Sequence, residues 1–414
     1  MNTRTEYDAI VVGGGPAGST CARFLTRAGL RVAIVDRAEF PRVKLCAGWL
    51  SEPVWDVLGI APSDYPSGLW PWDRCHVVHG GERHTARVRG YFIRRYEFDD
   101  FLLRESGAEI LTGQNVKRIE RGDDGVWTLD DALRTRYLIG AGGTHCPVAR
   151  AVAAHRPKPP VGVQEREFQA DAREVEGSRV GKDGEPELLL HDDLRGYSWN
   201  VPKSDWVNIG CGTVAAREVR GAWQHARAYF EKRHGVPASA AAELDRMHGH
   251  SYYLFHPDHL KSCHEGGALL VGDALGLAHP LTAEGIYPAL LSARIAAEAI
   301  IEGAPDRYRE RLENHPAIAS FELAFHTREL GARLASLGKS SNATSGAPSD
   351  ARGPARRLGR AALAHGFAHL FAGATVPGAQ LARRIARTAT RAVPAPAPTA
   401  PGPEKRSPSA RSAR

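Results

Sequence analysis

The chain has 414 residues, of which 43% are hydrophobic and 24% are charged, as in an ordinary globular protein with a core large enough for two intertwined domains. No run approaches the ~18 consecutive apolar residues of a membrane-spanning helix, and the N-terminus lacks the apolar stretch and cleavage site of a signal peptide. We therefore expect a cytoplasmic protein. The cysteines contain no Cys-x-x-Cys pair, which predicts reduced thiols and no zinc site. They are Cys21, Cys46, Cys75, Cys146, Cys211 and Cys263.

The net charge of +7 is unevenly distributed along the chain. Residues 351–414 contain eleven Arg, one Lys and one Glu, which gives this segment +11 and leaves −4 for the rest. The basic segment alone therefore accounts for the isoelectric point of 9.1. We expect no specific nucleic-acid binding. Two interpretations of the basic segment stay open: a shallow peripheral contact with the inner membrane face, and a solvated extension without a partner.

The first 36 residues have the pattern of a β-α-β unit. An apolar strand is followed by Gly13, Gly15 and Gly18 in a G-x-G-x-x-G pattern, then by a helix and by a second strand that ends at Asp36. This is the dinucleotide fingerprint. Gly13 permits the tight turn, Gly15 lets a pyrophosphate approach the helix N-terminus, and Asp36 is placed to bind ribose hydroxyls. The pattern predicts a bound dinucleotide without distinguishing NAD from FAD.

The rest of the chain continues this alternation of strands and helices and then changes in composition. The predicted elements, in chain order, are strands within 74–95, a short helix over 97–107, a three-stranded meander over 115–143, strands between 160 and 212, a helix over 216–234, a strand, loop and long helix over 267–300 with the helix starting near Thr282, and a second helical stretch over 305–338. Beyond it, Ala-rich segments have helical composition, and the Pro-, Ser- and Arg-rich end is predicted to be disordered.

A second informative motif is GALLVGDALG, followed by HPLTAEGIYPAL. An apolar strand delivers Gly272 and Asp273 to a loop, where the acid can hold a ribityl or ribose hydroxyl. Gly285 and Ile286, near the start of the next helix, can direct backbone N–H groups at the negatively charged ring of a reduced flavin. The alternative is an ordinary strand–loop–helix with a capping acid. Because the motif follows an N-terminal fingerprint, we predict FAD rather than NAD.

The ordered set GGGPAGS, Asp36, RYEFD, the Gly-rich loop after RYLIG, GDALG and PLTAEGI resembles the flavoproteins of the para-hydroxybenzoate hydroxylase fold, and among them the geranylgeranyl reductase family. KLCAG is similar to that family's Lys-x-Cys-Gly-Gly segment. YSWNVP, from Tyr197 to Pro202, is similar to its Tyr-x-Trp-x-Phe-Pro motif, with Val201 in place of Phe. The resemblance covers residues 1 to about 340.

The resemblance implies an α/β fold, in which a mostly antiparallel β-sheet domain for the substrate interrupts a Rossmann-like FAD-binding domain and a helical extension follows. The implied boundaries are 1–60, 91–160 and 258–304 for the FAD domain, 61–90 and 161–257 for the sheet domain, 305–338 for the helical segment and 339–414 for a basic, largely disordered tail. The implied FAD contacts are Gly13, Gly15, Ala17, Gly18, Asp36, Arg37, Lys44, Arg95, Val116, Gly272, Asp273, Gly285 and Ile286.

The family's cysteine segment passes over the substrate side of the flavin, which implies that Cys46 lies near the flavin N5. A thiol there can donate a proton or a hydrogen bond, and Lys44 nearby would lower its pKa. The alternative is a small buried hydrophobic residue, the usual role of a free cysteine. The implied substrate contacts are Trp49, Tyr197, Trp199 and Pro202. Their alternative is an ordinary core role, because aromatic residues alternating on a strand are common in cores.

The implied function is that of an FAD-dependent oxidoreductase that reduces C=C bonds of an apolar, isoprenoid-type substrate by hydride transfer from the reduced flavin. The electron donor would be NAD(P)H or a reduced electron-transfer protein. Two alternatives stay open: a flavin monooxygenase that hydroxylates an aromatic or apolar substrate, and a non-catalytic flavin-binding partner protein. The monooxygenase is weakened by Gly142, which stands where hydroxylases of this fold carry an acid.

Overall fold

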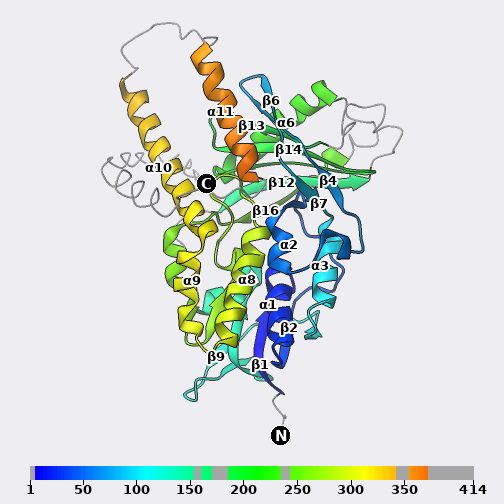
Figure 1. The fold of residues 1–414 in the computed structure, drawn as a ribbon, viewed down its shortest axis with the longest axis vertical. Coiled ribbons are helices and arrows are strands. Elements are labelled where there is room, and N and C mark those ends of the chain that lie inside the picture. Colours follow the sequence, from blue (N-terminus) through cyan, green and yellow to red (C-terminus); the bar gives the residue numbers. More distant parts are fainter. Residues whose placement is uncertain (1–4, 153–159, 170–184, 235–242, 342–353, 372–414) are drawn as a thin grey trace, which may run out of the picture.

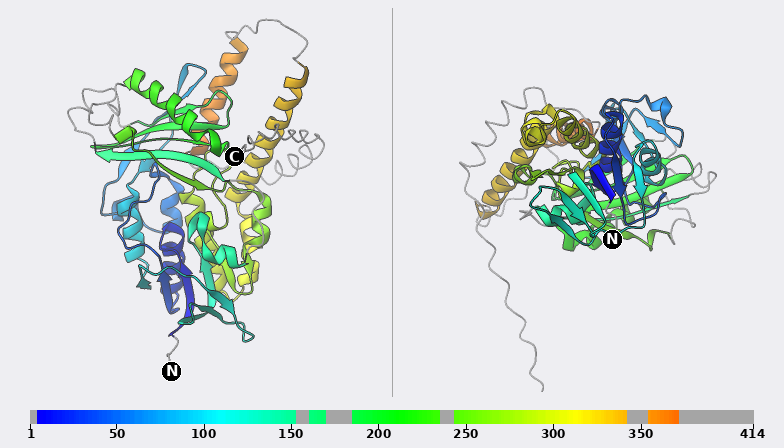
Figure 2. Two further views of the ribbon diagram at one scale, coloured as in Figure 1. Left: turned by 180° about the vertical axis from the view of Figure 1, so that it is seen from behind. Right: turned by 90° about the horizontal axis from the view of Figure 1, so that it is seen from below.

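The structure is a computed structural model that describes residues 5–152, 160–169, 185–234, 243–341 and 354–371. It has two halves, one built on an eight-stranded sheet and the other on a seven-stranded sheet (Figure 1). The view from behind in Figure 2 shows the seven-stranded sheet lying across one end of the other half. This is the predicted α/β architecture, in which an antiparallel sheet domain covers a Rossmann-like domain.

The eight-stranded sheet is parallel at its centre, with the order β17-β18-β11-β1-β2-β8. Its strands are β1 (Thr5–Val12), β2 (Val32–Val35), β8 (Glu109–Leu111), β9 (Ile119–Arg121), β10 (Trp127–Leu129), β11 (Leu133–Gly140), β17 (His264–Glu265) and β18 (Ala268–Leu270). The predicted meander is the antiparallel set β9-β10-β11. Because β1, β2, β11 and β18 are parallel, their carboxyl ends meet at one edge, where α/β proteins bind ligands.

Helices cover the eight-stranded sheet and complete its core. They are α1 (Pro16–Arg27), α2 (Pro53–Leu58), α3 (Arg95–Arg104), α4 (Pro147–Val152), α8 (Ile286–Ile301), α9 (Tyr308–Asn314) and α10 (Pro316–Ser341). Helix α8 packs along α1 and starts at Ile286, later than predicted, because Ala283 has a left-handed φ of 57°. The predicted helix over 305–338 is two helices, because Pro316 leaves its preceding residue, His315, in an extended conformation.

The seven-stranded sheet has the order β16-β12-β15-β14-β13-β5-β6 and is antiparallel except between β13 and β5. Its strands are β5 (Cys75–His79), β6 (Glu82–Ala86), β12 (Val161–Gln169), β13 (Glu187–Leu190), β14 (Gly196–Lys203), β15 (Trp206–Thr213) and β16 (His248–Tyr252). Helix α6 (Val219–His234) packs on one face of the sheet. A small sheet of β3 (Trp49–Ser51), β7 (Gly90–Phe92) and β4 (Trp70–Trp72) contributes aromatic rings to the core on the other face.

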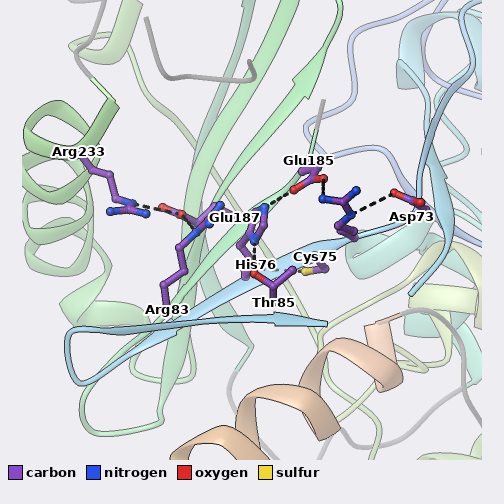
Figure 3. Close-up of polar contacts among 9 residues, drawn as sticks. Asp73, Cys75, His76, Arg83, Thr85, Glu185, Glu187 and Arg233 are labelled. Carbon is purple, nitrogen blue, oxygen red and sulfur yellow. Dashed lines mark hydrogen bonds and ion pairs between the residues drawn. The ribbon is translucent and has the colours of Figure 1, made fainter. Parts of the chain in front are cut away.

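A polar network joins β5, β6 and β13 to α6 (Figure 3). The Glu187 carboxylate is buried and accepts a hydrogen bond from Arg83 at 3.1 Å. It also accepts one from the Tyr229 hydroxyl at 3.1 Å. On the same face, the His76 ring lies between the Thr85 hydroxyl and the Glu185 carboxylate. Since neighbouring side chains alternate between the faces of a strand, Glu187 points away from Leu188, which contributes to the core on the other face. The network therefore stabilises one face of the sheet, and a ligand site on the opposite face would not include it.

Helix α11 (Pro354–Phe371) follows the predicted linker and packs on β5 and β6. Ala364 and Ala368 are buried there, and the Phe367 ring lies edge-on to Tyr197 with 5.5 Å between the ring centroids. The helix lies in the first of the Ala-rich segments that have helical composition, and its small side chains fit against the sheet. The rest of the predicted tail, 342–353 and 372–414, lies outside the described residues. None of the described helices is long and apolar enough to cross a membrane.

Candidate active site

A cavity of about 1030 Å³ lies between the two sheets. Its walls come from the first turn of α1, the loop 36–47, the start of α3, strands β12, β14 and β16, and the turn before α8. Its volume reaches the upper end of the range of about 300–1,000 Å³ that is usual for small-molecule sites. The cavity is therefore large enough for an extended cofactor together with part of a substrate.

The glycine turn before α1 brings bare backbone to one end of the cavity. Gly13 has a left-handed φ of 116°, and a Cβ there would lie 2.5 Å from the Ala141 carbonyl group. A Cβ at Gly18 would lie 1.8 Å from the Gly13 oxygen. Gly13 and Gly15 line the cavity, whereas Gly18 does not; its absent side chain lets α1 approach the turn. No side chain caps the α1 N-terminus at Gly15, so its N–H groups face the cavity as an anion site.

Asp36 ends β2 at the same edge of the sheet. One carboxylate oxygen accepts a hydrogen bond from Gly14 N at 2.7 Å, and the other accepts one from Ala38 N at 2.8 Å. These two bonds fix the carboxylate beside the glycine turn, where ribose hydroxyls would reach it. The neighbouring Arg37 and Val116 also line this part of the cavity, as predicted from the resemblance.

Positive charge gathers between the glycine turn and the cysteine segment. Arg95 donates hydrogen bonds to both carboxylate oxygens of Asp99, at 2.5 and 2.7 Å, and Arg42 lies 3.2 Å from the same buried acid. Burial lowers the pKa of Arg42 and of Lys44, and Arg95 lowers the pKa of Lys44 further. Two guanidinium groups share Asp99, and Lys44 lies close enough to Arg95 to be affected by its charge, so a positive surplus remains that suits a pyrophosphate. Sequence reasoning missed Arg42, because only the fold brings this loop residue close to Gly15.

The turn before α8 forms the opposite wall. The His279 ring nitrogen accepts hydrogen bonds from the N–H groups of Leu281 and Thr282 at 3.2 and 3.1 Å, which orders the turn. Gly285 caps α8 without a side-chain hydrogen bond, so backbone N–H groups of Gly285 and Ile286 are available to a ligand. Both residues line the cavity.

Asp273 and Ala17 line the cavity as well, but Gly272 does not. The structure shows a packing role for Gly272. A Cβ there would lie 3.0 Å from the Ala289 Cβ and 3.2 Å from the Ala17 Cβ. The missing side chain thus lets α1 and α8 approach each other at the end of β18.

Cys46 is half-buried, whereas the other five cysteines, all within the described residues, are buried. Its sulfur accepts a hydrogen bond from Gly48 N at 3.3 Å. Its carbonyl oxygen accepts one from Asn208 Nδ2 at 3.2 Å, and Asn208 Oδ1 in turn accepts one from Trp199 Nε1 at 2.6 Å. Asn208 therefore joins the cysteine segment to the aromatic wall of the seven-stranded sheet.

That wall is formed by Tyr197 and Trp199 of β14, together with Val201, which all face the cavity. The Tyr197 hydroxyl donates a hydrogen bond to the Thr282 oxygen at 2.5 Å and so connects the wall to the turn before α8. Pro202, predicted to contact the substrate, is buried opposite Val207 and is not among the residues that line the cavity. The physical reason is the two-residue period of a strand, which turns position 202 away from the face of 197, 199 and 201.

Trp49, predicted to contact the substrate, lines the cavity from β3. Its ring centroid lies 4.4 Å from that of Trp72 and 5.2 Å from that of Phe92. It therefore belongs both to the cavity wall and to the aromatic core beneath it.

Two carboxyl groups in the cavity, the buried Glu165 and the half-buried Glu284, escaped the sequence analysis. Burial raises the pKa of Glu165, on β12, to about 8. Burial also raises the pKa of Glu284 to about 8, and its carboxyl group accepts a hydrogen bond from the Ser51 hydroxyl at 2.9 Å. The alternation of Val161, Val163 and Glu165 along one strand was the available signal, because it places an acid in an apolar row.

These features fit FAD. The bare helix N-terminus and the basic residues match a pyrophosphate, Asp36 matches the adenosine ribose, and Asp273 with the start of α8 matches the ribityl chain and the ring. The fit rests on the steric requirement for glycine at positions 13 and 18, where a Cβ would overlap backbone atoms.

Comparison with known proteins agrees with this reading. Residues 6–58 match the model of the FAD binding domain. A digeranylgeranylglycerophospholipid reductase of Methanothermobacter thermautotrophicus is 30% identical over 341 residues, covering 74% of this chain and 82% of that protein. The chain belongs to the geranylgeranyl reductase family.

Two further proteins are similar to the chain, one in sequence and one in fold. A menaquinone reductase of Mycolicibacterium smegmatis is 28% identical over 358 residues, covering 74% of this chain and 79% of the relative. The crystal structure of a geranylgeranyl bacteriochlorophyll reductase-like protein from Thermoplasma acidophilum superimposes with a TM-score of 0.58 at 21% identity, covering 75% of this chain and 84% of that one. As a member of the family, the protein is an FAD-dependent oxidoreductase, which disfavours the non-catalytic alternative.

Proposed function

We propose that the protein reduces carbon–carbon double bonds in the isoprenoid chain of an apolar substrate. The observation that carries this proposal is the wall formed by Tyr197, Trp199 and Val201, which faces the turn before α8 across one cavity. Flat aromatic and aliphatic surfaces suit a prenyl chain. The names of the two reductases similar to this chain refer to a digeranylgeranyl lipid and to menaquinone, which supports the same substrate class.

Reduced FAD, when bound, supplies a hydride. The chain's own residues would bind, orient and desolvate the substrate. The glycine turn, Arg42 and Arg95 would hold the pyrophosphate away from the aromatic wall, so that the ring end of the cofactor lies near Cys46. The apolar wall would exclude water from the double bond, and the hydrogen bond from Tyr197 to Thr282 would keep the wall at a fixed distance from the turn before α8.

The sequence also predicts an electron donor and a membrane contact. The electron donor, NAD(P)H or a reduced electron-transfer protein, stays a prediction, as does a peripheral membrane contact of the basic C-terminal segment. Between the two catalytic alternatives, family membership favours the reductase over the monooxygenase. Gly142, which lines the cavity in place of the acid of hydroxylases, agrees with this preference.

Untargeted mass spectrometry of lipids from a deletion strain and its parent tests the proposal. We expect the deletion strain to accumulate an isoprenoid lipid that lacks one or more pairs of hydrogen atoms. Expression of the wild-type chain should restore the saturated species. Expression of the Glu120→Gln variant, changed at an exposed strand position outside the cavity, should do the same. A missing oxygen atom instead of missing hydrogens would support the monooxygenase and overturn the proposal.

A further inference from the structure

Glu165 is a buried acid on the substrate side of the cavity. It lies on β12 opposite Gly210 of β15, and its side chain is 1% exposed. A Cβ at Gly210 would lie 2.7 Å from the Glu165 Cβ and 2.4 Å from the Trp199 ring. The glycine therefore lets the indole ring lie beside the acid. Both residues line the cavity, so the carboxyl group and the aromatic wall meet at one place.

The Glu165 carboxyl group is incompletely paired. Its Oε1 atom is buried and has no hydrogen-bond partner within the described part of the chain. An ionised carboxylate in such a position would lose its hydration without compensation, so the neutral acid is the favoured form. Glu284 differs, because Ser51 donates a hydrogen bond to it. Glu165 thus keeps capacity for a hydrogen bond to a molecule bound in the cavity.

Charged and titratable groups face Glu165 from all sides of the cavity. They are Glu167 on β12, Lys203 and Tyr197 on β14, Lys44 and Cys46 before β3, Arg95 on α3, and His248, His250 and Tyr252 on β16. Lys203 lies 2.5 Å from Glu167, and Arg95 is paired with Asp99. The three cations lower the pKa of Glu165 and Glu167 raises it, but burial is the largest effect and raises it to about 8. We therefore expect the acid to be protonated at neutral pH.

Cys46 is the other candidate proton source, but the groups around its sulfur are donors. Gly48 N donates a hydrogen bond to it. Burial alone would lower the pKa of Arg95, yet Asp99 and then Cys46 raise it above its ordinary value, which places the guanidinium beside the sulfur. These donors occupy positions around the Cys46 sulfur, whereas the Glu165 Oε1 atom has no partner within the described residues.

We propose that Glu165 is the proton donor of the reduction and gives its proton to the alkene carbon that does not receive the hydride. This inference rests on the proposed function. The O–H bond of the acid breaks, and the π pair of the double bond forms the new C–H bond at the less substituted carbon. The tertiary carbon then accepts the hydride. The substrate gains two hydrogen atoms, FAD ends oxidised, and Glu165 ends as a carboxylate that takes its next proton from water.

The surroundings of Glu165 suit the charge that this step creates. Positive charge develops at the tertiary carbon, and the new carboxylate lies next to it. The Trp199 ring lies beside Glu165 and lines the cavity, and an indole ring attracts cations. The indole N–H donates a hydrogen bond to Asn208 Oδ1, with 2.6 Å between the nitrogen and the oxygen, which fixes the ring in place. The aromatic wall thus both binds the prenyl chain and stabilises the charge.

The first test is an infrared titration of the FAD-loaded protein without substrate. Protonated carboxyl groups and carboxylates absorb at separate frequencies, and Glu165 and Glu284 are both expected to be protonated at pH 6. The Glu165→Gln variant should lack one protonated-carboxyl band that the wild type loses as the pH rises through about 8. Glu284→Gln should lack a different band, which assigns the two signals. Absence of a Glu165 band at pH 6 would overturn the proposal.

The second test is a single-turnover reduction. The FAD-loaded protein is reduced anaerobically with dithionite and mixed with menaquinone that carries a tetraprenyl side chain, or with geranylgeraniol, and flavin reoxidation and substrate mass are followed. Glu165→Gln should slow reoxidation by about 10²- to 10⁴-fold, the range of general acid catalysis. The wild-type rate should fall above about pH 8, and Glu165→Gln should lack this dependence. Glu165→Asp should regain it, and Glu120→Gln should behave as wild type.

The outcomes separate the two proposals. If the wild type reduces neither probe, the proposed function fails, whereas the infrared titration still reports on Glu165. If the wild type reduces a probe and Glu165→Gln keeps both the rate and its pH dependence, the inference fails alone. Loss of the pH dependence in Cys46→Ser, with retention in Glu165→Gln, would assign the proton to the thiol and also overturn the inference.

Discussion

Replacement of Gly48 by alanine tests whether the cysteine segment needs a residue without a side chain. Gly48 has a φ of 69°, and a Cβ there would lie 1.9 Å from the Ile93 oxygen and 2.9 Å from Lys203 Nζ. The left-handed conformation costs an alanine about 1–2 kcal/mol, and overpacking adds about 1–3 kcal/mol. We therefore expect Gly48→Ala to reduce the free energy of unfolding by about 2–5 kcal/mol.

The chain offers a matched control for this variant. Gly59, at the C-terminus of α2, has a similar φ of 63°, but no atom lies within 4 Å of a Cβ placed there. Gly59→Ala should therefore cost only the conformational part, about 1–2 kcal/mol. Urea unfolding of the FAD-loaded variants measures both values. FAD release by Gly48→Ala should also be faster, because the hydrogen bond from Ile93 N to the Gly48 oxygen, at 2.9 Å, positions the segment beside the cofactor. Equal destabilisation by the two substitutions would refute the reasoning.

Three further predictions concern single carboxyl groups. Asp36→Ala removes the acceptor of the hydrogen bonds from Gly14 and Ala38. Since hydrogen bonds to a charged group contribute about 1.5–3 kcal/mol, the dissociation constant of FAD should rise about ten- to hundredfold in a fluorescence titration. An unchanged constant would contradict the assignment of Asp36 to the cofactor site. Glu187→Gln should lower the free energy of unfolding by about 1–3 kcal/mol, because the acid is 3% exposed and pairs with Arg83 and Arg233. It should leave FAD retention intact, and Glu218→Gln, in an exposed pair with Arg195, should cost only about 0–1 kcal/mol. The pKa of Glu165 is raised in the folded state to about 8, from an ordinary value of 4.5. The unfolding free energy therefore falls as the pH rises between these values, by about 1.4 kcal/mol per pH unit for one proton. Glu165→Gln should make the unfolding free energy less dependent on pH between 6 and 8, and parallel curves for variant and wild type would count against the raised pKa.

The sequence by itself determined the parts of the site that lie close together along the chain. The glycine turn, the helix after it and Asp36 form one β-α-β unit of about 30 residues, in which local spacing dictates geometry. The GDALG strand and the turn before α8 are similarly local, and the structure places Asp273, Gly285 and Ile286 along the cavity as expected. The period of β14 likewise placed Tyr197 and Trp199 on one face. The same period, applied to Pro202, would have excluded it from the cavity.

Only the tertiary structure decided which distant residues meet. Arg42 shares the buried Asp99 with Arg95, and Asn208 contacts both Cys46 and Trp199, although 162 residues separate Asn208 from Cys46. No local pattern reports such contacts, because they depend on how the two sheets are placed. The pKa of Glu165 is likewise a property of its surroundings: burial between the sheets raises it, whereas the same residue on an exposed strand would be an ordinary surface acid. The sequence therefore indicated where the cofactor binds, and the packing of one sheet over the other decided which acid can hold a proton beside it.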